Sequence, residues 1–152
     1  MCILPLLFVA VFTSCSPAQS EYENENTLSE YKVEESQKIK LSDCLSQNED
    51  HYLVFFFSET CHNCHEIMGD VIEFSHDDIV KLYFLDIKEP DKSVAISNDI
   101  DETIGKSSID GLCIMGTPTI IEVEGWIIMA NVPGKEGCLS LLNELRLMNY
   151  NK

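Results

Sequence analysis

Two cysteines spaced as Cys-x-x-Cys, Cys61 and Cys64, are the residues of this sequence that point most directly to chemistry. An unbroken apolar run, residues 52–57, precedes them and predicts a buried strand. The apolar residues that come next share one face of a helix; they are Cys64, Ile67, Met68, Val71 and Ile72. The sequence therefore predicts that Cys61 lies at or just before a helix N-terminus.

A helix N-terminus favours a thiolate, because its free N–H groups and its dipole stabilise negative charge. We predict that the pKa of Cys61 lies below the usual value of about 8.5, so that Cys61 is a nucleophile at neutral pH. Cys64, one turn further on, is within reach to attack a mixed disulfide on Cys61 and release the substrate. His62, between them, is expected to stabilise the thiolate as a cation; the alternative is an exposed histidine with little influence.

Length and charge restrict the other functions open to the chain. Its 152 residues are enough for one domain with a real core plus flanking segments. The formal net charge is −16, and the sequence contains no basic cluster. Direct binding to nucleic acid needs a positive footprint, so we expect no nucleic-acid partner. We also expect the chain to be a monomer.

The N-terminal segment has the pattern of an export signal. Residues 1–14 are uncharged and mostly apolar, too short to span a bilayer comfortably but typical of a secretory apolar region. They end in Phe12, Thr13 and Ser14 before Cys15, which resembles a bacterial lipoprotein signal; residues 1–15 are then the signal, and Cys15 carries the lipid. The alternative is ordinary cleavage near Ala18, which would release a soluble secreted or periplasmic protein.

Two further segments follow the signal. Residues 16–37 are rich in Glu, Asn and Ser and predict a disordered acidic tether that holds the domain off a membrane. Residues 38–152 predict the folded domain. Its expected strands are residues 39–41, 52–57, 79–87, 119–123 and 126–130. Its expected helices are a short one carrying Cys44 and Leu45, the cysteine helix to about Ser75, one carrying Ile96, Ile100 and Ile104, and a closing one carrying Cys138, Leu141, Leu142, Leu145 and Met148.

This order predicts an α/β domain in which helices flank a central mixed sheet, with a C-terminal hairpin around Glu124 and Gly125 and a closing helix. With Cys-x-x-Cys opening a helix and Thr117-Pro118 directly before the hairpin, 54 residues after Cys64, the sequence resembles the thioredoxin-like superfamily. The resemblance implies a cis Pro118 that faces the two sulfurs, with Cys61 as attacking and Cys64 as resolving thiol. It also implies that Thr117 offers backbone groups to an extended substrate.

Three departures accompany the resemblance. Thr60 stands where cytosolic thioredoxins have Trp, and His62-Asn63 stand where they have Gly-Pro. Phe55, six residues before Cys61, stands where they bury a carboxylate. The proton of the resolving thiol then passes to His62, Glu59 or water, and the direction of electron flow stays open.

These observations predict a thiol–disulfide oxidoreductase that acts on exported proteins and is anchored through lipid. It needs no organic cofactor and no metal, and a membrane or soluble thiol donor or acceptor regenerates the pair. The main alternative is a non-catalytic module that binds extended peptides beside Pro118.

The same motif has two other possible interpretations, a haem c attachment site and a zinc site, and the sequence argues against both. Residues 61–65 also match the Cys-x-x-Cys-His haem c pattern, with His65 as axial ligand and Met68, Met115, Met129 or Met148 opposite. Four good strands argue against a small haem c domain. A zinc site would need a distant second ligand pair, which His51 and His76 do not form.

Three cysteines of the expected folded domain lie outside the motif. Cys44 and Cys138 lie on expected apolar helix faces, so we assign them to the core. Cys113 lies five residues before Pro118 and is either an inert buried cysteine or a third redox thiol. Pairing among the three cannot be read from the sequence.

Overall fold

The computed structural model describes residues 32–88 and 93–150. The expected signal with Cys15 and most of the expected tether lie outside the described residues. The fold begins slightly before residue 38, because a 3-10 turn spans Glu35–Gln37 and the buried Gln37 donates from Nε2 to the Leu82 carbonyl at 3.5 Å.

The centre of the molecule is a four-stranded mixed sheet in the order β2-β1-β5-β6. Its strands are β1 (His51–Phe57), β2 (Lys81–Asp86), β5 (Thr119–Glu124) and β6 (Ile127–Pro133). β1 pairs in parallel with β2, whereas β5 pairs antiparallel with both β1 and β6. β1 is thus a central strand, which explains why its sequence is apolar without alternation.

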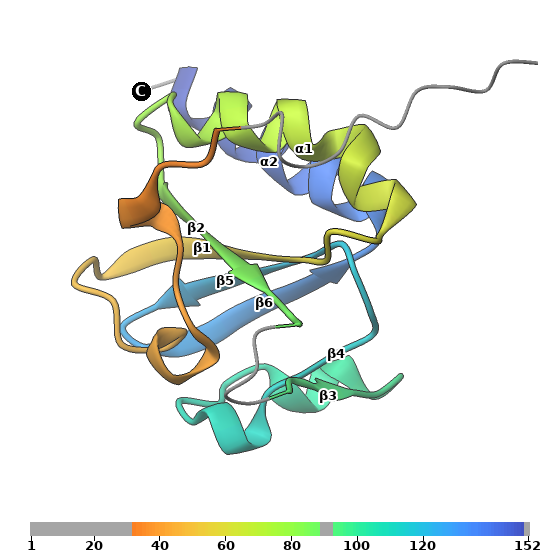
Figure 1. Cartoon of the computed structure of the whole chain (residues 1–152). Coiled ribbons are helices and arrows are strands. Elements are labelled where there is room, and N and C mark those ends of the chain that lie inside the picture. The colour runs from red at the N-terminus through yellow and green to blue at the C-terminus, as the bar shows by residue number, and fades with distance from the viewer. Residues whose placement is uncertain (1–31, 89–92, 151–152) are drawn as a thin grey trace, which may run out of the picture.

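The two faces of the sheet are covered differently (Figure 1). Both α-helices, α1 (His62–Ser75) and α2 (Lys135–Tyr150), lie on one face, against Leu53 and Phe55 of β1. Short segments cover the other face, where alternate β1 residues meet Cys44, Leu45, Val94, Leu112 and Ile114. The expected α/β architecture of a mixed sheet flanked by helices is confirmed, and so is the C-terminal hairpin followed by a helix.

The prediction of a helix around Ile96, Ile100 and Ile104 is wrong. The segment forms β3 (Ala95–Ile96), the 3-10 turns η4 (Ile100–Thr103) and η5 (Ile109–Gly111), and β4 (Cys113–Ile114), which pairs in parallel with β3. Ile96 and Ile104 are 61% and 48% exposed, so their spacing does not mark a buried stripe. The intervening Asn and Asp residues favour turns over helix, because their side chains compete for backbone hydrogen bonds.

Two smaller expectations near the domain's start are also wrong. Residues 39–41 form no strand; a single bridge joins Lys38 to Phe84, and the 3-10 turn η3 follows at Leu41–Asp43. Cys44 ends that turn instead of lying within a short α-helix.

The C-terminal part differs from expectation by a few residues. The hairpin loop is Gly125-Trp126, with φ of 56° and 62°, one position later than expected; two positive φ values are typical of the tight turn that matches strand twist. Met148 in α2 is 65% exposed and not part of the core.

Candidate active site

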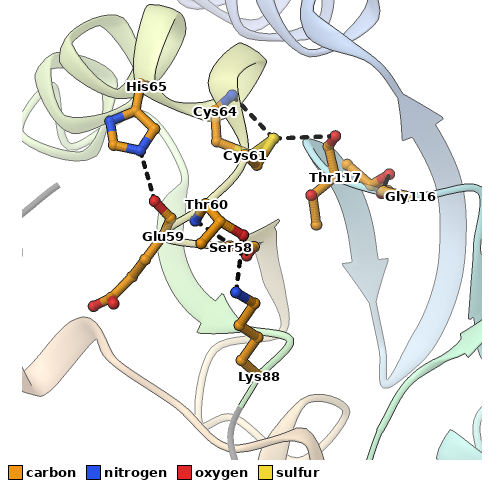
Figure 2. Close-up of a disulfide and its surroundings, with 10 residues drawn as sticks. Ser58, Glu59, Thr60, Cys61, Cys64, His65, Lys88, Gly116 and Thr117 are labelled. Carbon is orange, nitrogen blue, oxygen red and sulfur yellow. Dashed lines mark hydrogen bonds between the residues drawn. A yellow bond between two sulfur atoms is a disulfide. The ribbon is translucent and has the colours of Figure 1, made fainter. Parts of the chain in front are cut away.

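The Cys-x-x-Cys pair lies at the junction of β1 and α1. After β1 the chain turns sharply, and the Cys61 N–H donates to the Ser58 carbonyl at 3.0 Å. Cys61 is the N-cap residue of α1, as predicted, and forms a disulfide with Cys64 across a Cα–Cα distance of 5.2 Å (Figure 2). Cys44, Cys113 and Cys138 are free thiols.

The N-terminus of α1 gives Cys61 the surroundings of a stabilised thiolate. The Cys64 N–H donates to Cys61 Sγ at 3.2 Å, so the sulfur occupies the position of a helix cap. A full negative charge there gains from this hydrogen bond and from the helix dipole. Cys61 is half-buried while Cys64 is completely buried, so Cys61 is the sulfur that an incoming disulfide can reach.

The loop before β5 meets the pair from the other side. The Thr117–Pro118 peptide bond is cis, as the resemblance implies, and the Thr117 carbonyl oxygen lies 3.3 Å from Cys61 Sγ. The loop is anchored at both ends, since Thr119 Oγ1 donates to the Gly116 carbonyl at 2.7 Å and the Gly134 N–H donates to the Pro118 carbonyl at 2.8 Å. The fold therefore holds Thr117 beside the disulfide, although it lies 56 positions after Cys61 in the sequence (Figure 2).

His62 is directed along the helix surface toward Glu66. Its side chain is 86% exposed, and its Nε2 lies 3.3 Å from Glu66 Oε1. Glu66 also receives a hydrogen bond from Lys135 Nζ at 2.6 Å, and this lysine is the main cause that lowers the Glu66 pKa. The structure thus places His62 in a surface cluster with Glu66 and Lys135.

Phe55 occupies the position where cytosolic thioredoxins, which the sequence resembles, bury a carboxylate. Phe55 is fully buried, stacks on Phe57 at a centroid distance of 6.0 Å and meets Phe84 edge to face at 6.0 Å. Glu59 is one of the expected proton acceptors for the resolving thiol. Its side chain is exposed, and its backbone carbonyl oxygen lies 2.7 Å from His65 Nε2.

One residue at the site was not found by sequence reasoning. Lys88, just past β2, donates from Nζ at 2.8 Å to Oγ1 of Thr60, the residue before Cys61 in the sequence (Figure 2). The two residues are 28 positions apart, and no local pattern in the sequence indicates that they meet.

The remaining cysteines differ from the pair. Cys44 and Cys138 are completely buried, as expected, and burial raises the pKa of each thiol to about 12. Cys113 is half-buried, with Sγ 3.7 Å from the Asp99 carbonyl oxygen.

Within 32–88 and 93–150, no group of three or more His, Cys, Asp or Glu residues is arranged to hold a metal ion. Over the same ranges, every helix is too short or too polar to cross a bilayer.

No protein-family model matches the sequence, and comparison with curated proteins finds no match. Several solved thioredoxins resemble the structure. Thioredoxin f from spinach chloroplast is 12% identical with a TM-score of 0.50, covering 72% of this chain and 85% of its own. A mutant thioredoxin from Halobacterium salinarum is 17% identical with a TM-score of 0.48, covering 75% and 92%. Oxidized mitochondrial thioredoxin 3 from Saccharomyces cerevisiae is 17% identical with a TM-score of 0.46, covering 72% and 92%.

The likeness to the spinach structure shows that this chain has a thioredoxin-like fold. That fold, with a Cys-x-x-Cys disulfide at the N-terminus of α1, supports thiol–disulfide oxidoreductase chemistry in general.

Proposed function

We propose that this protein is a thiol–disulfide oxidoreductase that exchanges disulfides with exported proteins. The observation that carries the proposal is the position of Cys61 Sγ. It caps α1, accepts the Cys64 N–H at 3.2 Å, and lies 3.3 Å from the Thr117 carbonyl oxygen. A thiolate-stabilising helix end and a peptide backbone therefore meet at one accessible sulfur.

The exchange proceeds in two balanced steps. The Cys61 thiolate attacks one sulfur of a substrate disulfide; a Cys61–substrate bond forms, and the other substrate sulfur leaves as a thiolate that takes up a proton. Cys64 then loses its proton and attacks Cys61 Sγ, which forms the Cys61–Cys64 bond and releases the second substrate thiolate. Two electrons pass from the protein to the substrate, and the reverse sequence oxidises a substrate dithiol.

The second step needs an acceptor for the Cys64 proton. Phe55 stands in place of a buried carboxylate, so we propose that water, Glu59 or His62 takes up this proton. Thr117 and Pro118 are proposed to bind an extended substrate segment by strand addition. No organic cofactor takes part, and a membrane or soluble thiol donor or acceptor regenerates the pair.

We further propose that residues 1–15 direct export, that Cys15 carries a lipid anchor, and that the acidic segment after it tethers the domain outside the cytoplasm. The apolar signal pattern and the small residues before Cys15 support this location.

Mixed-disulfide trapping tests the proposed function. A Cys64→Ser variant mixed with a disulfide-bonded model peptide is expected to accumulate a covalent adduct on Cys61, because the resolving thiol is missing. The control is the Cys61→Ser/Cys64→Ser double variant, which keeps the binding surface but has no nucleophile. If the peptide binds reversibly and no adduct forms on Cys61, the protein is a peptide-binding module and the enzymatic proposal is wrong.

A further inference from the structure

The turn that carries Cys61 is held by the side chain of Lys88, which lies just after β2. In this turn, residues 58–61, the Ser58 hydroxyl accepts the Thr60 N–H at 3.4 Å and lies 3.2 Å from Thr60 Oγ1. Lys88 Nζ donates to the same Thr60 hydroxyl at 2.8 Å. Ser58 is buried, so the turn is attached to the core at one end and to Lys88 at the other (Figure 2).

Lys88 is itself fixed at both of its ends. Its backbone N–H donates to Asp86 Oδ1 at 3.0 Å, and the neighbouring Ile87 N–H extends the β1–β2 pairing by donating to the Phe57 carbonyl at 3.0 Å. Ordering a long, flexible lysine side chain normally costs free energy, because conformational entropy is lost. Here its backbone is already anchored, which reduces the part that remains to be ordered.

The ammonium groups of Lys88 and Lys135, two lysines near the site, have different hydrogen-bond partners. Lys135 Nζ lies 2.6 Å from a Glu66 carboxylate oxygen, so an opposite charge offsets it at close range. In the part of the chain that the structure describes, the partner of Lys88 Nζ is a neutral hydroxyl. The ammonium therefore lies beside Thr60, the residue that precedes Cys61, while the Asp86 carboxylate accepts the Lys88 backbone N–H.

We propose that Lys88 is a positioning residue for the nucleophile, which fixes the turn of residues 58–61 and places a positive charge at Thr60, the residue before Cys61. The inference rests on the proposed function and deepens it. We infer that Lys88 and Thr60 stabilise the Cys61 thiolate in addition to the helix N-terminus. A cation close to a sulfur favours the charged thiolate over the neutral thiol.

The test measures how the rate of Cys61 alkylation depends on pH in the fully reduced protein, with the modified site identified by mass spectrometry. Lys88→Met removes the charge and keeps an apolar stem, while Lys88→Arg keeps the charge. The matched control is Lys81→Met, an equal charge change at the opposite end of β2, about 20 Å away along the strand.

Lys88→Met is expected to shift the alkylation profile to higher pH and to slow the reaction at neutral pH about two- to fivefold, the size typical of partly exposed charges. Lys88→Arg should retain most of the wild-type rate. The difference should shrink in about 1 M salt, where screening acts within roughly 3 Å. Thr60→Val, which removes the hydroxyl that holds Lys88, should move the profile in the same direction.

The inference is overturned if Lys88→Met has the profile of the wild type, or if Lys81→Met shifts it equally, since the effect would then be absent or merely one of net charge. Circular dichroism and thermal melting of each variant report its fold. Alkylation needs no substrate disulfide, so failure here is distinguishable from failure of the trapping experiment.

Discussion

The cysteines of the described chain differ in reactivity because their surroundings differ. Cys61 is half-exposed and caps a helix, where negative charge is stabilised. Cys44 and Cys138 are completely buried among apolar side chains, where a thiolate would lose its hydration. Under the proposed function, the same residue type serves as the nucleophile at Cys61, whereas Cys44 and Cys138 are buried core residues.

This difference predicts the order in which the reduced, folded protein is alkylated. Because burial raises the pKa of Cys44 and Cys138 to about 12, both should resist iodoacetamide up to about pH 9, while Cys61 reacts at neutral pH. Timed quenching followed by mass spectrometry gives the order, and unfolding in denaturant should expose both resistant thiols. Rapid labelling of Cys44 or Cys138 in the folded chain would contradict the described core.

At the scale of elements, α1 and α2 are linked across their surfaces near the site. Lys135 at the start of α2 reaches Glu66 in the second turn of α1 at 2.6 Å. The lysine lowers the pKa of Glu66 below its ordinary value of 4.5, so the folded state favours the ionised carboxylate. Such a group adds stability above the unfolded pKa and loses it as the pH falls through the folded pKa.

We therefore predict that Glu66→Gln lowers the melting temperature slightly at pH 6, and that the difference from wild type closes as the pH falls below about 4.5. The effect should be small because both side chains are partly exposed and screened by solvent. Thermal melting between pH 6 and pH 3 measures it, with Glu73→Gln on the exposed side of the same helix as control. A difference that stays constant with pH would argue against this pair.

The elements were predictable from sequence where local pattern and tertiary burial agree. The continuous apolar run of β1 is buried on both faces of the sheet, and the apolar face of α1 packs on the sheet. In both elements the sequence pattern and the burial therefore indicate the same secondary structure. Ile96, Ile100 and Ile104 have helical spacing, yet Val94, Thr103 and Leu112 supply the buried contacts of that segment. Short 3-10 turns bury single residues without any period, and a periodic pattern therefore cannot detect them.

At the scale of the whole molecule, the sheet assembles the site from distant segments. β1 delivers Cys61, the loop before β5 delivers Thr117, and the end of β2 delivers Lys88. The motif and the Thr-Pro sequence allowed the first two to be predicted. Lys88 could not be, since its contact with Thr60 depends on how far β2 extends beside β1 and on an Asp86 side chain that orients the following backbone.

Under the proposed function, Cys61 and Cys64 form a reversible redox pair, and a redox titration measures whether they do. The purified protein is equilibrated with glutathione buffers of known potential, and the state of each cysteine is read by alkylation and mass spectrometry. We predict a reversible two-electron couple, near about −270 mV for a reductase or about −120 mV for an oxidant of secreted thiols. A pair that stays oxidised across the whole range, or one that carries a haem-sized mass, would contradict the proposed function.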